Sequence, residues 1–318
     1  ARNYVIFAAI SSIVFMLWTI CRLNYAILDR ARPQGVITDE RSIIGRIFRR
    51  FVFVVDPQRR KPSFGTLVNP VMIKEFRSRR FGRLHWILRL VAFCALVSLG
   101  LTYATTAGTI DWGVQTIAGI MVILQVALIV LLTPSLAAGL ISSERESGGW
   151  ELLQMTPLST ARILSGKLMS VVWTVLLILL ATLPGYLVII YIDPNLWGQI
   201  SRVLICLALT AVLALTLSAA VGSLCQRTTV SMTLAYVLLI GICAGTMIVW
   251  MGRGAPFGHS TVEAALLINP MAAALSLAGM PGFVEYTLVP ASWKITGCAS
   301  VICLMILFLR TWRLARPN

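Results

Sequence analysis

Residues 114–141 read VQTIAGIMVILQVALIVLLTPSLAAGLI and contain no charged side chain. An apolar run of about 20 residues is long enough to cross the hydrocarbon core of a membrane as a helix. The rest of the chain has a similar composition, because 58% of its 318 residues are hydrophobic and 12% are charged. A soluble domain carries about 25% charged residues. The composition therefore excludes an ordinary soluble fold and predicts an all-α, polytopic membrane helix bundle.

Six further apolar runs are similar to residues 114–141, so the sequence predicts seven membrane-spanning helices in total. The predicted spans are residues 4–21, 86–107, 114–141, 168–192, 203–224, 230–251 and 290–309. Residues 264–279 are also apolar, but this stretch is short and Asn269-Pro270 interrupts it. We therefore expect a re-entrant or interfacial hairpin there rather than an eighth span.

Charged residues are distributed unevenly among the segments that join these spans. Residues 22–85, 142–167, 225–229 and 310–318, together with Arg89, hold 23 Lys or Arg and 8 Asp or Glu, whereas the remaining segments hold 4 of each. The positive-inside rule assigns the first set to the cytoplasm, so we expect a cytoplasmic C-terminus. The net charge of +15 then indicates contact with anionic membrane lipid. Nucleic acid is not an expected partner, because no base-reading motif accompanies the basic residues.

The chain divides into three predicted parts. Residues 1–28 hold the leading span, and residues 29–66 form a basic cytoplasmic linker. Within this linker, residues 40–55 alternate apolar side chains with arginines at helical spacing, which predicts an amphipathic helix on the membrane surface. Residues 67–318 hold the other six spans. Residue 1 is Ala and the leading span enters from outside, so we expect residues 1–28 to be the last span of an upstream half.

Residues 69–81 read NPVMIKEFRSRRF and predict a short helix before the span at 86–107. An Asn-Pro pair at its start supplies a capping side chain and a proline suited to the first helical position. A Glu and an Arg four residues apart form a stabilising pair on its surface. We interpret this segment as an elbow helix on the inner membrane surface, although any basic helix beside a span has a similar pattern. The residues assigned to it are Asn69, Pro70, Lys74, Glu75 and Arg79.

Residues 142–159 read SSERESGGWELLQMTPLS and carry more features than a connecting loop needs. Charged residues precede a double glycine, a short helix is expected over residues 150–155, and Pro157 ends it. Residues 160–167 then lead into the next span. A short rigid helix in this place is suited to fit a cleft on another protein, and the alternative is a plain loop with a structural turn.

No catalytic or metal-binding signature occurs in the sequence. The pair Gly166-Lys167 lacks the upstream glycine of a phosphate-binding loop, and the seven cysteines form no CxxC motif. The predicted spans carry neutral polar residues such as Gln125 rather than the mid-membrane carboxylates that are typical of ion-driven carriers. We therefore expect neither an enzyme nor a cofactor, and energy for any transport has to come from another chain.

Residues 144–159, ERESGGWELLQMTPLS, resemble the membrane-spanning subunits of ABC-2 type transporters. The cytoplasmic loop between the second and third core spans of that family has the form E-R-E-x-G-T-W-E-x-L-x-x-x-P-[LV]-S. Gly149 departs from this pattern where Thr is usual. The Asn69-Pro70 elbow and residues 226–229, QRTT, are also similar to the family. The resemblance covers about residues 67–312 and implies a six-span unit with both ends cytoplasmic.

This resemblance implies that the loop at 142–167 contains a coupling helix, which sits in a groove of a separate ATP-binding subunit. It assigns partner contact to Glu144, Arg145, Glu146, Gly148, Trp150, Glu151 and Leu152. ATP with magnesium is expected in that partner chain. A second permease half, either another copy of this chain or a fused upstream half, is expected to complete the transporter. The family implies a multi-pass exporter in the bacterial cytoplasmic (inner) membrane.

Two other functions stay open on the sequence alone. A non-transporting membrane scaffold uses the same kind of loop to dock a cytoplasmic partner, so the loop does not separate it from a permease. A secondary carrier driven by an ion gradient is disfavoured because the predicted spans lack a carboxylate. The apolar span walls suit lipids, drugs and peptides about equally.

Overall fold

The computed structural model describes part of the chain. The described residues are 71–72, 75, 92–93, 95–100, 103, 114–150, 155, 159–192, 194–254 and 256–315. The predicted leading span at 4–21 and the linker at 29–66 lie outside these residues, as does most of the predicted span at 86–107. Of that span, residues 92–93, 95–100 and 103 are described, and they are helical.

The described part of the chain is helical, and it contains no β-strand beyond one isolated bridge between Arg253 and Phe257. In order, its elements are α5 (Val114–Ala137), α6 (Gly139–Glu146), α8 (Thr160–Ala181), α9 (Leu183–Ile192), the 3-10 turn η1 (Pro194–Leu196), α10 (Trp197–Leu224), α11 (Thr228–Ile240), the π-helical turn η2 (Gly241–Gly245), α12 (Thr246–Met251), α13 (His259–Leu267), α14 (Pro270–Leu277) and α15 (Ala291–Ala315).

Five helical stretches are long and apolar enough to cross a membrane. They are Gln115–Glu146, Thr160–Tyr191, Pro194–Leu224, Thr228–Met251 and Ala291–Leu314. Each overlaps one of the predicted spans, so the prediction of a multi-pass helical membrane protein is confirmed at this level. The helices α13 and α14 are bent relative to each other by 106° at their break. The predicted interruption of this apolar stretch at Asn269-Pro270 is therefore present, and we call the bent pair of α13 and α14 the hairpin.

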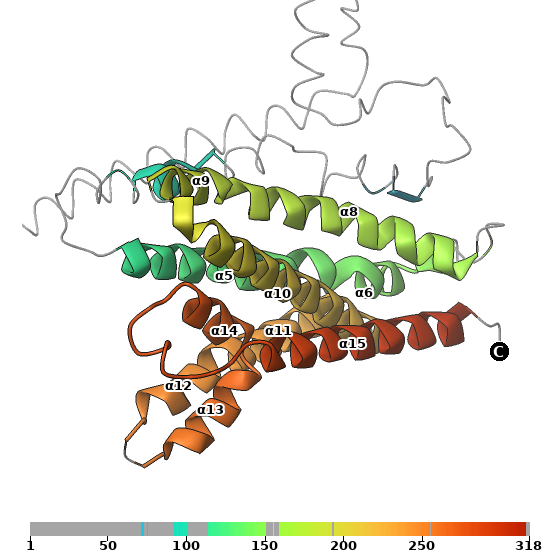
Figure 1. Cartoon of the computed structure of the whole chain (residues 1–318). Helices are drawn as coiled ribbons and strands as arrows, with labels where there is room; N and C mark the ends of the chain where they lie inside the picture. The colour runs from blue at the N-terminus through green and yellow to red at the C-terminus, as the bar shows by residue number, and fades with distance from the viewer. Residues whose placement is uncertain are drawn as a thin grey trace, which may run out of the picture. The chain divides into compact units, whose positions relative to one another are not determined.

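Helix α10 is the central element of the bundle. It packs against α15, α5, α14 and α11, and Figure 1 shows it among these helices. In its most apolar window 67% of the residues are buried, compared with 17% for the span that contains α11 and 22% for α15. Helices α11 and α15 carry exposed large apolar side chains, among them Val237 and Val301. Exposed apolar surface of this kind is more stable against lipid than against water.

A close helix crossing holds α10 against the second half of the first described span. Gly222 lies against the backbone carbonyl of Ala138, and a Cβ atom at this glycine would collide with that carbonyl oxygen. The same oxygen accepts hydrogen bonds from Ser142 Oγ at 2.9 Å and from Ser231 Oγ at 3.0 Å. Membrane helices approach this closely where their contact residues are small.

The helix preceding the predicted loop is longer than the sequence predicted. We expected the span to end at residue 141, but α6 continues to Glu146. The hydroxyls of Ser142 and Ser143 donate to carbonyls one turn back, so these residues fit a helix. The break comes at Gly148, whose φ of 71° is in the left-handed region that favours glycine. The connection between α6 and α8 therefore spans residues 147–159, within the predicted cytoplasmic loop at 142–167.

Candidate coupling site

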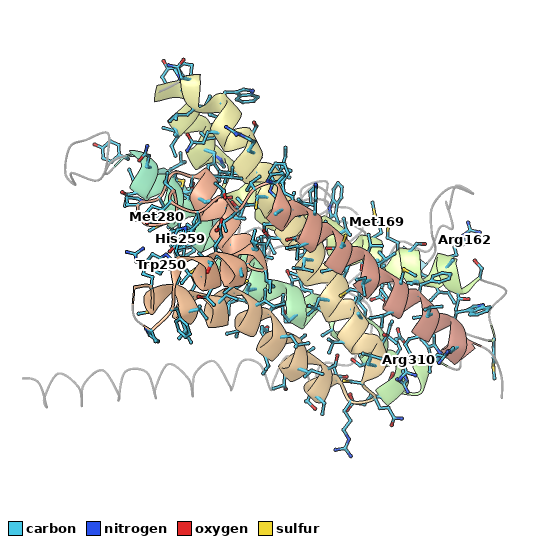
Figure 2. All side chains as sticks on the ribbon, turned by 60° about the horizontal axis from the view of Figure 1, so that its bottom comes forward. Arg162, Met169, Trp250, His259, Met280 and Arg310 are labelled. Carbon is cyan, nitrogen blue, oxygen red and sulfur yellow. The ribbon has the colours of Figure 1, made fainter. Side chains whose placement is uncertain are left out.

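The two ends of the bundle differ in their side chains. We call one the charged end, defined by Glu144, Lys167 and Arg227, where α6 and α10 finish and α8 and α11 begin. The other is the hairpin end, defined by α13 and α14. Figure 2 shows Arg162 and Arg310 towards the first end and Trp250, His259 and Met280 towards the second. The loop that the sequence marked as a coupling segment is at the charged end.

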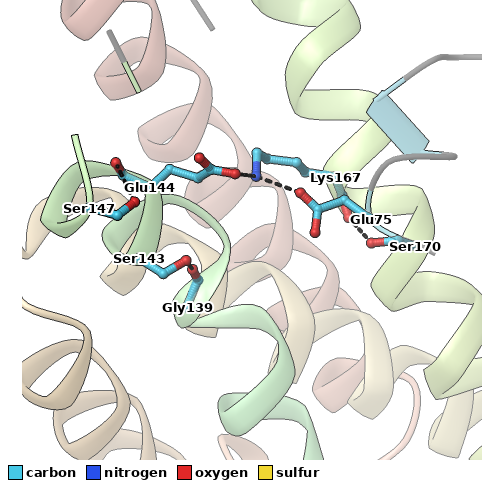
Figure 3. Close-up of polar contacts among 7 residues, drawn as sticks. All are labelled: Glu75, Gly139, Ser143, Glu144, Ser147, Lys167 and Ser170. Atoms are coloured by element: carbon cyan, nitrogen blue, oxygen red, sulfur yellow. Dashed lines mark hydrogen bonds and ion pairs between the residues drawn. The ribbon is translucent and has the colours of Figure 1, made fainter. Parts of the chain in front are cut away.

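Lys167 is at the centre of an ion-pair cluster at the charged end. Its Nζ lies 2.7 Å from Glu75 Oε1 and 3.0 Å from Glu144 Oε1, as Figure 3 shows. The Lys167 side chain is 2% exposed and both carboxylates are mostly buried. An ammonium group is stable at such a site only when opposite charges and hydrogen bonds replace its water. The cluster therefore connects the segment around Glu75 to α6 and α8.

Arg145 connects α6 to the end of α10. Its Nη1 donates to the carbonyl oxygens of Ser223 at 3.5 Å and Cys225 at 3.3 Å. The last carbonyls of a helix have no partner within the helix and carry partial negative charge. The guanidinium group supplies both a donor and a positive charge at that place, so it stabilises the end of α10.

Glu146 connects α6 to the beginning of α11. Its Oε2 accepts a hydrogen bond from the backbone N–H of Thr228 at 2.9 Å and a second from the hydroxyl of the same residue. A carboxylate at a helix N-terminus satisfies an unpaired N–H and interacts favourably with the helix dipole. Three consecutive residues, Glu144, Arg145 and Glu146, therefore reach three different helices.

Trp150 packs into the bundle beside the C-terminal helix. Its side chain is 8% exposed, and its Nε1 donates to the carbonyl oxygen of Leu314 at 3.4 Å. We predicted partner contact for this residue. The structure shows that it also has an intramolecular contact with α15. Any partner contact by Trp150 is restricted to the small part of the ring that remains exposed.

Most of the other predicted site residues are not among those that the structure describes. Glu151 and Leu152 lie outside the described residues, as do Asn69, Pro70, Lys74 and Arg79 of the elbow. Several neighbouring residues at the charged end, for which no partner contact was predicted, also have exposed side chains. Among them are Ser147, Met155, Ser159, Arg162, Gln226 and Arg227. A partner that docks at this end meets these side chains together with Glu146 and Gly148.

Gly149 is the position where the loop departs from the family pattern. A Cβ atom here would collide with Glu144 Oε2. That oxygen is at the end of a flexible side chain, so a threonine would displace the carboxylate rather than the backbone. Glycine at this position therefore leaves room for Glu144 to bend towards Lys167.

Sequence reasoning missed Asn269 as an organising residue within the hairpin. Its Nδ2 donates to the carbonyl of Cys243 at 2.9 Å and to Thr246 Oγ1 at 2.7 Å, and its Oδ1 accepts from the backbone N–H of Met271 at 2.8 Å. One amide side chain therefore caps α14 and connects the hairpin to the π-helical turn η2. The adjacent Pro270 indicated the start of a helix. The hydrogen bonds of Asn269 to Cys243 and Thr246 could not be predicted, because no sequence pattern near residue 269 indicates them.

Within the described residues, no group of three or more His, Cys, Asp or Glu side chains could hold a metal ion. The described cysteines, including the buried Cys206 and Cys243, are free thiols. In comparisons with known proteins, no family model matches this chain and no curated protein matches it.

Proposed function

We propose that this protein is the permease subunit of an ATP-driven ABC-2 type transporter, acting as an exporter in a bacterial cytoplasmic membrane. The observation that carries the proposal is the sequence of residues 144–159 in a connection between two candidate spans. In this proposal the charged end faces the cytoplasm, where the positive-inside rule favours basic residues. A separate ATP-binding subunit docks there and supplies the energy.

The contacts at the charged end suit a mechanical connection between the loop and the spans. Motion imposed on a loop is transmitted when the loop is bonded to rigid elements, and it is lost in a flexible connection. Glu144, Arg145 and Glu146 are bonded to α8, α10 and α11 respectively. A displacement of the loop by ATP-driven closure of the partner therefore acts on several helices together.

Because Glu144, Arg145 and Glu146 are bonded to helices of the bundle, we extend the proposed partner contact to exposed residues near them. Charged residues that are bonded within the bundle transmit the motion, whereas the exposed residues around them meet the partner. Met155, with 82% of its side chain exposed, is the large apolar residue in the best position for a hydrophobic groove. Arg162 and Arg227 supply exposed positive charge at the same end of the bundle.

The proposal is tested by co-purification from the native membrane in a mild detergent. The full chain is compared with Met155→Asp, which places a charge on the proposed docking surface, and with the matched control Met251→Asp at the other end. We expect an ATP-binding cassette subunit, identified by mass spectrometry, with the wild type and with the control but not with Met155→Asp. Met251 is similarly exposed, at 77%, so a general effect of the charge appears in both variants.

Two results would contradict the proposal in different ways. If no ATP-binding cassette subunit accompanies the wild-type chain, the proposed energy source is absent. If the subunit binds but its ATPase activity produces no flux of any compound across reconstituted vesicles, the scaffold function replaces the permease.

A further inference from the structure

The last turns of helix α15 carry two arginines without an acidic partner. Arg310 and Arg313 are exposed, and Figure 2 shows Arg310 towards the charged end. Neither guanidinium group forms an ion pair with an acidic side chain of the described residues. The planar donor fork of arginine suits phosphate and carboxylate oxygens. Within the part of the chain that the structure describes, both groups can therefore take an anion from outside the bundle.

The two arginines continue an apolar stripe along one side of α15. Ile302, Ile306, Leu309 and Arg313 recur at intervals of four, three and four residues, which places them on one face of a helix. Arg310 follows Ile306 by four residues and extends the same face. The three apolar side chains are 57%, 37% and 50% exposed. The described helices therefore leave this face uncovered from the apolar residues up to the arginines.

A second exposed stripe runs beside the first and ends in an aromatic side chain. Val301, Met305, Phe308 and Trp312 recur with the same spacing, and each is exposed by 43% or more. Tryptophan is enriched at the boundary between hydrocarbon and headgroups, because its ring has an apolar body and a polar N–H. The two stripes therefore indicate the same boundary on α15, one with guanidinium groups and the other with an indole.

The turn of α15 that carries the arginines is held from the bundle side. Thr311, which lies between them in the chain, is 1% exposed, and its hydroxyl donates to the carbonyl of Leu307 at 2.8 Å. The carbonyl of Leu314 accepts a hydrogen bond from the indole Nε1 of Trp150 at 3.4 Å. A backbone held in this way loses less conformational freedom on binding than a frayed helix end. The structure therefore presents the two arginines as a pair.

The length of the apolar stripe matches one leaflet of a bilayer. From Ile302 to Arg313 a helix rises about 16 Å, at 1.5 Å per residue. The hydrocarbon core of a membrane is about 30 Å thick, so each leaflet contributes about 15 Å. An acyl chain alongside the apolar residues brings the phosphate of its own headgroup to the level of the arginines. A soluble protein partner covers the arginines but leaves Ile302, two turns deeper, without an occupant.

We propose that this side of α15, which we call the arginine face, binds one anionic phospholipid. Its phosphate lies between Arg310 and Arg313, and an acyl chain lies along Ile302, Ile306 and Leu309. Phosphatidylglycerol is preferred to phosphatidylcholine, because the choline cation of the second lipid repels the guanidinium groups. The site needs no ATP-binding partner and applies to whichever leaflet contains the charged end, so it goes beyond the proposed function.

The test is photolabelling of the purified full-length chain in nanodiscs of phosphatidylcholine. The discs contain a trace of phosphatidylglycerol or of phosphatidylcholine with a diazirine in the acyl chain, and mass spectrometry locates the labelled residues. Labelling of the arginine face is divided by labelling of the exposed Val237 and Leu238 in α11, which report contact with bulk lipid. We expect the phosphatidylglycerol probe to exceed the phosphatidylcholine probe by roughly 25-fold, or roughly fivefold for each arginine near an anionic headgroup.

Four variants separate the arginine face from a general effect of charge. Arg313→Gln should lower the preference roughly fivefold, and the double variant Arg310→Gln, Arg313→Gln should remove it. The double variant with lysine at both positions keeps the charge and should keep most of the preference. Lys294→Gln removes an exposed cation from the first turn of the same helix and should change nothing.

Misfolding does not imitate the expected result, because neither arginine has an acidic partner among the described residues. The unfolding midpoints of all four variants should therefore match that of the wild type. The proposal is overturned if both probes label the wild-type arginine face equally, or if the double glutamine variant keeps the preference. Equal labelling together with loss of a co-purifying protein from that variant would identify a protein-binding surface instead. Failure of the wild type to bind an ATP-binding subunit contradicts the proposed function and leaves these lipid measurements unaffected.

Discussion

The ammonium group of Lys167 lies 3.0 Å from a carboxylate oxygen of Glu144, and the two residues come from helices on either side of the proposed coupling loop. Glu75 approaches the same ammonium group to 2.7 Å from a segment 92 residues away in the chain. Three parts of the chain therefore meet at one buried positive charge. Removing that charge takes the shared ammonium group away from two carboxylates that lie close together.

Lys167→Met should destabilise the protein strongly for this reason. Loss of one partner of a buried ion pair costs about 3–5 kcal/mol, and here two acidic side chains also repel each other. The measurement is thermal unfolding in detergent, with the exposed Arg162→Met as the control. The triple variant Lys167→Met, Glu75→Gln, Glu144→Gln should recover part of the lost stability. Equal midpoints for Lys167→Met and the control would show that the cluster contributes nothing.

Gly222→Ala should disrupt the helix crossing between α10 and the end of α5. The added methyl group collides with the Ala138 carbonyl, and a backbone carbonyl cannot rotate away as a flexible side chain can. Overpacking of this kind costs about 1–3 kcal/mol. Gly198→Ala in the same helix is the matched control, because no atom lies within 4 Å of a Cβ there. Because alanine is a better helix former than glycine, Gly198→Ala should leave the unfolding midpoint unchanged or raise it. Midpoints that change equally for both variants would show that the crossing at Gly222 is not the cause.

Asn269→Asp separates the two functions of the hairpin amide. The carboxylate keeps an oxygen that accepts from Met271 N–H, but it loses the donors to Cys243 and Thr246. We expect α14 to stay capped while the hairpin detaches from η2. Buried Cys243 should then react faster with a membrane-permeant thiol reagent than in the wild type, with exposed Cys298 as the internal reference. An unchanged ratio of the two rates would show that the amide bonds do not hold the hairpin in place.

The orientation of the bundle predicts which loops a membrane-impermeant reagent can reach. In a background without the seven native cysteines, we expect Met251→Cys to react in intact cells and Met155→Cys to react only after permeabilisation. Both side chains are highly exposed and lie at opposite ends of the spans, so each serves as the control for the other. The reverse pattern would place the charged end outside and would remove the basis for a cytoplasmic ATP-binding partner.

The sequence by itself determined where the five described candidate spans lie along the chain, while their helices extend beyond several of the predicted limits. An uncharged apolar run of this length has few alternatives to a membrane-spanning helix. Each backbone N–H or C=O group without a hydrogen bond is costly in hydrocarbon, and a helix bonds these groups internally. The hairpin could be predicted as well, since Asn269-Pro270 interrupts an apolar run that is too short to span. Local composition was sufficient in both cases.

The predicted end of the apolar span at residue 141 is not the end of the helix. Glu144, Arg145 and Glu146 are unsuited to hydrocarbon, but they are ordinary helical residues once a span has left the membrane. The helix continues until the left-handed turn at Gly148. Charge therefore marked the end of the apolar layer, and glycine marked the end of the helix.

Only the tertiary structure decided what the polar residues contact. Lys167 and Glu75 are far apart in sequence, as are Trp150 and Leu314, and no periodicity links such pairs. A pocket lined by residues of α5, α9, η1 and α10, together with Ala278, likewise depends on how these elements pack against one another. Hydrophobic pattern acts along the chain and was visible in the sequence, whereas ion pairs and cavities depend on distances across it.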